Sequence, residues 1–94
     1  MQHSGYMLAS GKNGTLYIGV TNDLVRRIYE HRTASVDGFA KQHDVRTLVY
    51  FEISQDPNSA ITRERKLKRR RRAWKIALIE RDNPEWRDLY QDIA

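Results

Sequence analysis

The sequence lacks several features that would define other classes of protein. It contains no cysteine, which excludes disulfides, thiolate zinc sites and cysteine nucleophiles together. No apolar run approaches the roughly 18 residues that a membrane-spanning helix needs, so no membrane partner is expected. The first residues also lack the charged start, apolar centre and cleavage site of a secretion signal. These absences predict a cytoplasmic protein.

Negative charge is scarce relative to positive charge. The 12 acidic residues are outnumbered by 17 basic ones, which leaves a formal net charge of +5. Much of the excess lies in residues 63–75, where Lys68 to Arg72 are five consecutive basic residues. Such residues repel one another, and counterion release makes a polyanion their natural partner. A solvated helix face is the alternative interpretation of this run.

Length and local patterns predict one small domain over residues 1–94, because 39% hydrophobic content supports one modest core. The segments 5–10, 15–20 and 47–53 are predicted to be strands. Helices are predicted from Thr21 or Asn22 to about Arg32, from Pro57 to a break between Arg70 and Arg72, and from about Ala73 to Arg81. Residues 33–44 are expected to form a loop. The order ββαβαα predicts an α/β (α+β) fold with a small three-stranded antiparallel sheet flanked by helices.

The first two strands carry one tyrosine each. A two-residue turn at Asn13–Gly14 would place Lys12 opposite Thr15. In that register Tyr6 and Tyr17 lie on the same face of the sheet, since side chains alternate along a strand. Ordinary amphipathic packing is the alternative explanation for the two tyrosines.

The first predicted helix places an arginine and a histidine on its inner side. At 100° per residue, Arg27 and His31 fall beside the apolar positions, whereas Arg26 and Glu30 point toward solvent. Two polar side chains one turn apart at the margin of an apolar face favour a functional site. A structural histidine at the edge of the core is the alternative.

A carboxylate interrupts the apolar side of the second predicted helix. Glu64 falls among Ala60, Ile61 and Leu67, where an unpaired charge would be costly. The carboxylate is therefore expected to bind a metal ion or a cationic side chain. A salt bridge with Lys68 is the alternative.

These residues resemble the GIY-YIG nucleases. The second half of that signature is present as Tyr17-Ile18-Gly19, whereas the first half is reduced to Ser4-Gly5-Tyr6. Arg27 and His31 follow Tyr17 by ten and fourteen positions, and Glu64 matches the glutamate of the family. The likeness covers nearly the whole chain. Within the family, the chain resembles the small, single-domain bacterial branch related to the N-terminal domain of the excision-repair nuclease. That resemblance implies a role in DNA repair.

The resemblance implies hydrolysis of DNA phosphodiester bonds with one Mg²⁺ or Mn²⁺ ion. Glu64 would be the only protein ligand of that ion, and Arg27 would hold a phosphate oxygen. Tyr6 is the candidate general base, and Tyr17 would order the water or the phosphate. His31 would exchange a proton with Tyr6 or act as the base itself. Gly19 and Asn83 are candidate supports of the site.

The basic run would grip the DNA backbone without reading its sequence. The expected contacts are Lys68, Arg69, Arg70, Arg72 and Lys75; a continued helix would place Arg71 near Glu64. A domain this small favours low sequence specificity and single-stranded, flapped or branched DNA, and a nucleoid-associated location. Two alternatives stay open: a catalytically silent nucleic-acid-binding module that uses the Lys66–Lys75 face, and a basic accessory protein of RNA or ribosomes.

Overall fold

The structure, a computed structural model, describes residues 2–33 and 44–94. Three strands form one antiparallel sheet in the order β2-β1-β3: β1 (His3–Ala9), β2 (Leu16–Thr21) and β3 (Thr47–Ser54). The described helices are α1 (Leu24–Arg32), α3 (Pro57–Arg69), α4 (Arg72–Asp82) and the single turn α5 (Tyr90–Ile93). The predicted α+β fold and its ββαβαα order are confirmed. The loop predicted at 33–44 lies almost entirely outside the described residues.

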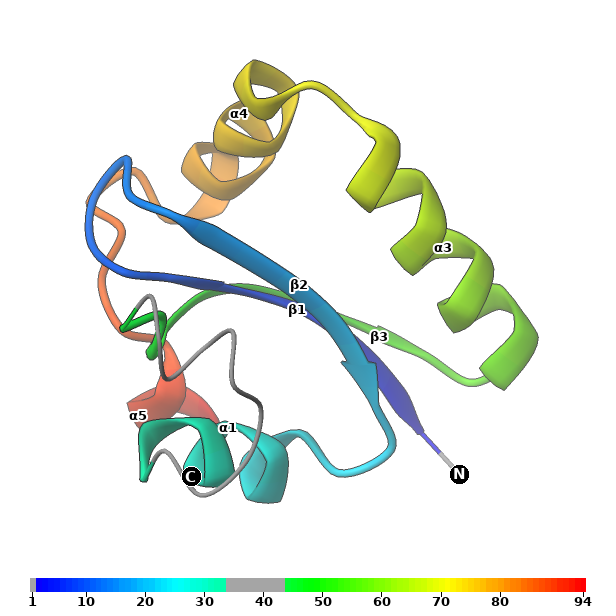
Figure 1. Ribbon diagram of the computed structural model, residues 1–94. Helices are drawn as coiled ribbons and strands as arrows, with labels where there is room; N and C mark the ends of the chain where they lie inside the picture. The colour runs from blue at the N-terminus through cyan, green and yellow to red at the C-terminus, as the bar shows by residue number, and fades with distance from the viewer. Residues whose placement is uncertain (1, 34–43) are drawn as a thin grey trace.

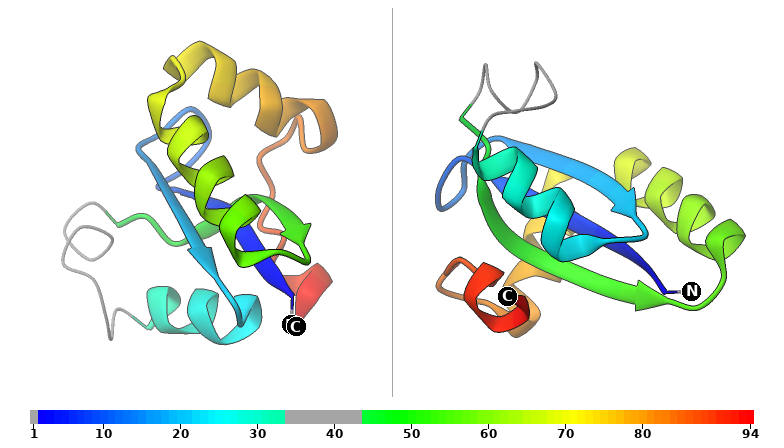
Figure 2. Two further views of the ribbon diagram at one scale, coloured as in Figure 1. Left: turned by 90° about the vertical axis from the view of Figure 1, so that its right-hand side faces the viewer. Right: turned by 90° about the horizontal axis from the view of Figure 1, so that it is seen from below.

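The sheet separates two layers of helices, as Figures 1 and 2 show. α3 and α4 cover one face, where Met7 and Ile18 of the sheet pack with Leu67 and Ile79. α1 and α5 cover the other face, where Tyr6, Leu8, Ile28 and Leu48 form the second cluster. Because β1 is the central strand, its side chains reach both cores, and six of its seven residues are buried. The strand β2 stays at the edge of the sheet, between α1 and α3.

The hairpin between β1 and β2 differs from the predicted two-residue turn. Ala9 pairs with Leu16, and the loop closes through hydrogen bonds from Ser10 N to Thr15 O and from Gly14 N to the carbonyl of Gly11. The predicted pairing of Lys12 with Thr15 is therefore wrong by two residues. A shift of two keeps every side chain on its face, so the predicted common face of the tyrosines is unaffected.

A β-bulge distorts the other side of the central strand. Met7 pairs with Tyr50 and Leu8 pairs with Leu48, which leaves Val49 as the extra residue on β3. Val49 and Tyr50 consequently both pack into the core beneath α3 and α4, although side chains of neighbouring residues normally alternate.

Helix boundaries follow their capping residues. Asp23 caps α1 by accepting from the amide of Arg26 at 3.2 Å, so the predicted cap at Thr21 or Asn22 is wrong. Asp56 caps α3 just before Pro57, as the sequence predicts. α3 ends at Arg69 because Arg70 has an extended backbone, with ψ of 152°.

The C-terminal segment is held against β3 by an amide side chain. Asn83 is buried, and its Nδ2 donates to the carbonyls of Val49 and Arg87, at 3.2 and 3.0 Å. Farther along, Leu89 N donates to Leu48 O at 2.8 Å. Asn83 thus anchors a part of the fold, and its hydrogen bonds do not reach the predicted site residues. Within the described residues, no helix is long and apolar enough to cross a membrane.

Candidate active site

The hydroxyl of Tyr6 connects two side chains of α1. It lies 3.2 Å from Nε2 of His31 and accepts a hydrogen bond from Nε of Arg27 at 3.4 Å. With the guanidinium as donor to the phenol oxygen, the phenol O–H is available to donate to the imidazole. Tyr6 and His31 are both 1% exposed, so this contact is shielded from bulk water.

Tyr17 completes an aromatic group on the same face of the sheet. Its ring centroid lies 6.3 Å from that of Tyr6 and 5.2 Å from that of His31. Both separations lie within the range of favourable tilted ring contacts. Tyr17 stands on the edge strand and is only partly buried, so it is the member of the group that faces the surface. The predicted convergence of the two tyrosines, Arg27 and His31 is present in the structure.

Gly19 leaves the space that the Tyr6 ring occupies. Tyr6 and Gly19 are directly paired across β1 and β2. A Cβ atom on Gly19 would lie 2.5 Å from the Tyr6 hydroxyl oxygen and 2.6 Å from Cζ, which no real side chain tolerates. The absence of a side chain therefore lets the phenol lie directly over Gly19 of β2. At Gly5, by contrast, a Cβ would meet only Cγ of Glu52, at 3.6 Å, so this departure from the family signature leaves no strained packing.

Arg27 is held at the surface end of this group. Its side chain is 32% exposed, whereas that of Arg26 is 76% exposed, which agrees with the predicted facing of α1. The Tyr6 hydroxyl raises the pKa of Arg27 above its ordinary value, mainly by hydrogen bonding, although partial burial acts in the opposite direction. The guanidinium is therefore a permanent positive charge.

Glu30 is the residue near the site that the sequence interpretation missed. It was expected to face solvent, but its carboxylate lies 3.5 Å from both Arg27 and Arg26. The signal was present in the i,i+3 spacing from Arg27. Nη1 of Arg27 faces the Glu30 carboxylate and Nε donates to the Tyr6 hydroxyl, so two nitrogens of the guanidinium are held.

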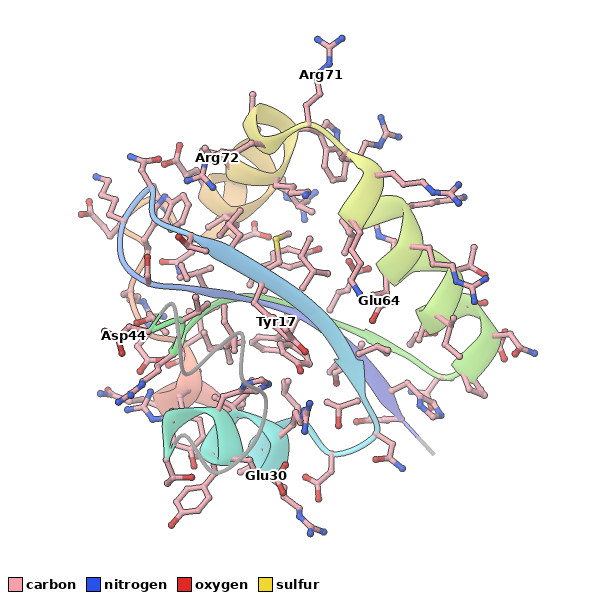
Figure 3. All side chains as sticks on the ribbon, viewed as in Figure 1. Tyr17, Glu30, Asp44, Glu64, Arg71 and Arg72 are labelled. Carbon is pink, nitrogen blue, oxygen red and sulfur yellow. The ribbon has the colours of Figure 1, made fainter. Side chains whose placement is uncertain are left out.

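Glu64 approaches from the other layer. It lies on α3, and its Oε1 is 3.5 Å from Nζ of Lys68, with the Glu64 side chain 17% exposed. The expected place inside an apolar stripe is only partly correct, because Ile61 is 40% exposed. Figure 3 shows Glu64 on the side of α3 that faces the sheet, with Tyr17 on β2. Arg27 and His31 come from α1, in the helix layer on the opposite face of the sheet, and Tyr17 stands on the edge strand β2.

Two open hollows lie along the edge strand β2, and their lining residues locate Glu64 relative to Arg27 and Tyr17. The larger, about 810 Å³, is lined on α1 by Arg27 and on α3 by Ile61, among others. The smaller, about 350 Å³, includes Tyr17 and Lys68 in its lining. Ile61 and Lys68 lie three residues before and four residues after Glu64 on α3. Glu64 is therefore on the helix face between the two hollows.

The consecutive basic residues have different environments. Arg72 donates to the carbonyls of Asn13 and Gly14 at 2.6 Å, which fastens the hairpin loop to α4. Arg71 points away from the molecule in Figure 3; the expected position near Glu64 is wrong, because α3 ends at Arg69. For the described part of the chain, Arg69 and Arg71 have no acidic partner.

Lys75 lies near the site rather than on a separate surface. Its Nζ donates to the carbonyl of Lys68 at 3.3 Å, and both lysines line the smaller hollow beside Tyr17. Two ammonium groups beside a surface tyrosine form a site suited to a phosphate.

A three-stranded α+β domain with this tyrosine, arginine and histidine group matches one class of protein. Residues 2–77 match the model of the GIY-YIG catalytic domain, and the chain belongs to this family, whose members are usually nucleases.

The relatives found by sequence and by structure are UPF0213 proteins. UPF0213 proteins from two strains of Pseudomonas aeruginosa are 34% identical over 61 residues, which cover 65% of this chain and 59% of theirs. The chain therefore matches about three fifths of the length of these curated relatives. The solution structure of a UPF0213 protein from Bacillus halodurans has a TM-score of 0.58 and 25% identity, with 94% of this chain and 93% of that one covered.

Proposed function

We propose that this protein is a metal-dependent nuclease that hydrolyses phosphodiester bonds of DNA with low sequence specificity. The observation that supports this proposal best is the Tyr6 hydroxyl, which contacts both a guanidinium and an imidazole beneath the surface. A phenol can donate one hydrogen bond and accept others, and this one lies between a cation and a nitrogen base. Here the phenol joins an anion-binding group to a proton acceptor, and both functions are required to attack a phosphate.

The residues on the α1 side would divide the work of phosphoryl hydrolysis. Arg27 would bind a non-bridging oxygen and offset the charge that grows in the transition state. As the phenol proton of Tyr6 passes to Nε2 of His31, 3.2 Å away, the phenol oxygen would accept a proton from the attacking water. Tyr17, partly exposed on β2, would order the water and the phosphate.

Glu64 suits a single hydrated divalent cation. A lone carboxylate fits Mg²⁺ or Mn²⁺, which retain several waters and share phosphate oxygens with the protein ligand. The described residues contain no group of three or more histidine, aspartate or glutamate side chains that would hold a more fully enclosed ion. When bound, the cation would polarise the phosphate and stabilise the leaving oxygen. Lys68 would have to release Glu64 and would then face the phosphate.

The test is cleavage of end-labelled single-stranded, flapped and duplex DNA with and without Mg²⁺ or Mn²⁺. We expect cleavage that requires metal and is lost in Glu64→Gln, which keeps the size of the side chain. Glu85→Gln is the matched control, because Glu85 is exposed on the segment after α4. Calorimetric titration with Mn²⁺ provides a second measurement: the Glu64 variant should lose binding while the control keeps it. Cleavage by Glu64→Gln at the normal rate would contradict the metal site.

The ion pair between Glu64 and Lys68 favours a second candidate function. If the carboxylate serves only this pair, the domain is a catalytically silent module that binds nucleic acid through its basic face. DNA binding without Mn²⁺ binding or cleavage would identify that case. Retained oligonucleotide binding with no metal response distinguishes it from an unfolded preparation.

A further inference from the structure

The corner between α3 and α4 contains a tryptophan flanked by arginines. Trp74, in the first turn of α4, is partly exposed at the margin of the core. The Cζ atoms of Arg70 and Arg63 lie over its ring, at 4.8 and 5.8 Å from the centroid. The second tryptophan, Trp86, is buried and donates to Glu80 at 2.7 Å. Trp74 is therefore the tryptophan that a ligand can reach.

The two guanidinium groups above Trp74 are held differently. Nε of Arg63 lies 3.1 and 3.3 Å from the two carboxylate oxygens of Glu52, so this group is fixed in place. Arg70 is exposed, and among the described residues it has no acidic partner. Its stacking on the indole is therefore the contact that a ligand could replace or share at small cost.

We propose that Trp74 and Arg70 form a stacking site for an unpaired nucleobase. A nucleobase has the flat apolar face that stacks on an indole and also on a guanidinium plane. Base stacking on an aromatic side chain contributes more than an exposed cation–π contact, so a base can enter beside or beneath Arg70. The neighbouring Arg69 and Arg71, which lack acidic partners among the described residues, supply positive charge for the flanking phosphates.

The stacking site lies next to the candidate active site, so both can contact the same DNA strand. Lys75 follows Trp74 directly and lines the smaller hollow together with Tyr17. A strand that passes Tyr17 thus meets Lys75 and Lys68 before it reaches Trp74. Bases in a duplex are already stacked on one another, so only a single-stranded segment can use this corner. The inference rests on the proposed function and adds to it a preference for substrates with unpaired bases near the cut.

The experiment compares an oligothymidine with an abasic strand that has the same number of phosphates. Binding is measured with EDTA, followed by tryptophan emission and by anisotropy of a labelled strand. We expect the oligothymidine to quench emission and to bind about 5- to 100-fold more tightly than the abasic strand. Trp74→Leu should abolish both the quenching and most of the preference. Because no cleavage is needed, failure of the proposed hydrolysis does not affect this result.

Two further variants keep the test independent of folding. Trp74→Phe retains an aromatic ring in the core margin, so it should lose the quenching and keep part of the preference for thymidine. Tyr29→Leu removes an aromatic side chain that is 58% exposed on the outer side of α1, and it should behave as the wild type. Equal quenching by the two strands, an absence of quenching, or an unchanged preference in a folded Trp74→Leu would each overturn the proposal.

Discussion

The aromatic group around Tyr6 is dispersed along the chain but compact in space. The run from Arg69 to Arg72 is continuous in the chain, but its side chains point to different surroundings. Tyr6, Tyr17 and His31 are far apart in the chain, yet the centroids of their rings lie within 6.3 Å of one another. The arginines are consecutive, yet Arg72 binds the hairpin loop and Arg71 points into solvent. Strand pairing brings distant residues together, whereas the end of a helix separates neighbours.

The comparison also separates two ways of using charge. Arg27 is a single cation held by Tyr6 and Glu30, so its position is defined before any ligand binds. Arg69 and Arg71 have no acidic partner among the described residues and carry long flexible side chains. A fixed charge can stabilise one transition state, because no reorganisation is needed. Flexible charges suit the phosphate backbone, where the geometry of contact varies.

The largest effect is expected from removal of the fixed cation. Arg27→Ala should lower single-turnover cleavage by about 100- to 1000-fold, the usual loss when one preorganised stabilising group is deleted. Arg26→Ala, one residue earlier and exposed to solvent, should change the rate by less than about 3-fold. Cleavage rates at saturating metal and DNA provide the measurement. Equal losses in the two variants would show that the position of Arg27 has no special value.

A smaller but still large effect is expected when the position of Tyr6 is disturbed. Gly19→Ala forces a methyl group against the phenol, so turnover should fall about 100-fold and the free energy of unfolding by about 1–3 kcal/mol. Gly5→Ala has room for its methyl group and should leave both nearly unchanged. Urea denaturation and cleavage rates test the pair. Normal turnover in Gly19→Ala would contradict the role of Tyr6.

Lys68 and a metal ion would compete for the Glu64 carboxylate. Removal of Lys68 should therefore increase metal affinity by a moderate amount, whereas the two preceding substitutions cause losses. Because the pair is partly exposed, it stabilises by no more than about 1 kcal/mol, and Lys68→Met should tighten Mn²⁺ binding by up to about 5-fold. Lys66→Met, an exposed position on the same helix, is the control. Titration without DNA measures the change. If Mn²⁺ binds Lys68→Met with unaltered affinity, Glu64 does not exchange one partner for the other.

The smallest effects should distinguish the consecutive arginines from one another. Arg69→Met and Arg71→Met should each reduce the log–log salt slope of DNA binding by roughly 0.7 to 0.9 without affecting thermal stability. Arg72→Met should lower stability by about 1 kcal/mol, or roughly 4–8 °C in Tm, because the hairpin loop loses its anchor. Thermal unfolding and a salt series measure both. The same pattern in all three variants would indicate one undifferentiated basic surface.

The sequence was sufficient for features that depend on local periodicity. The 3.6-residue repeat placed Arg27 and His31 inward and Arg26 outward, and the structure agrees. The two-residue period of strands predicted the common face of Tyr6 and Tyr17, even though the turn was wrong. That prediction was correct because a slip of two residues does not change the face. From the sequence, Gly19 is only a candidate support of the site; the Tyr6 ring that leaves no room for a side chain there is seen only in the structure.

Features that depend on non-local packing were decided only by the tertiary structure. The sequence by itself determined the types of element, the inner face of α1 and the excess of positive charge. It did not determine that Glu64, on α3, would lie in the helix layer opposite Tyr6 and His31, or that Arg72 would bind the hairpin loop. Those contacts join segments that are far apart in the chain, and their geometry depends on the β-bulge, on the strand register and on where α3 ends. Each of these is a balance among competing backbone hydrogen bonds and packing contacts, which no local pattern records.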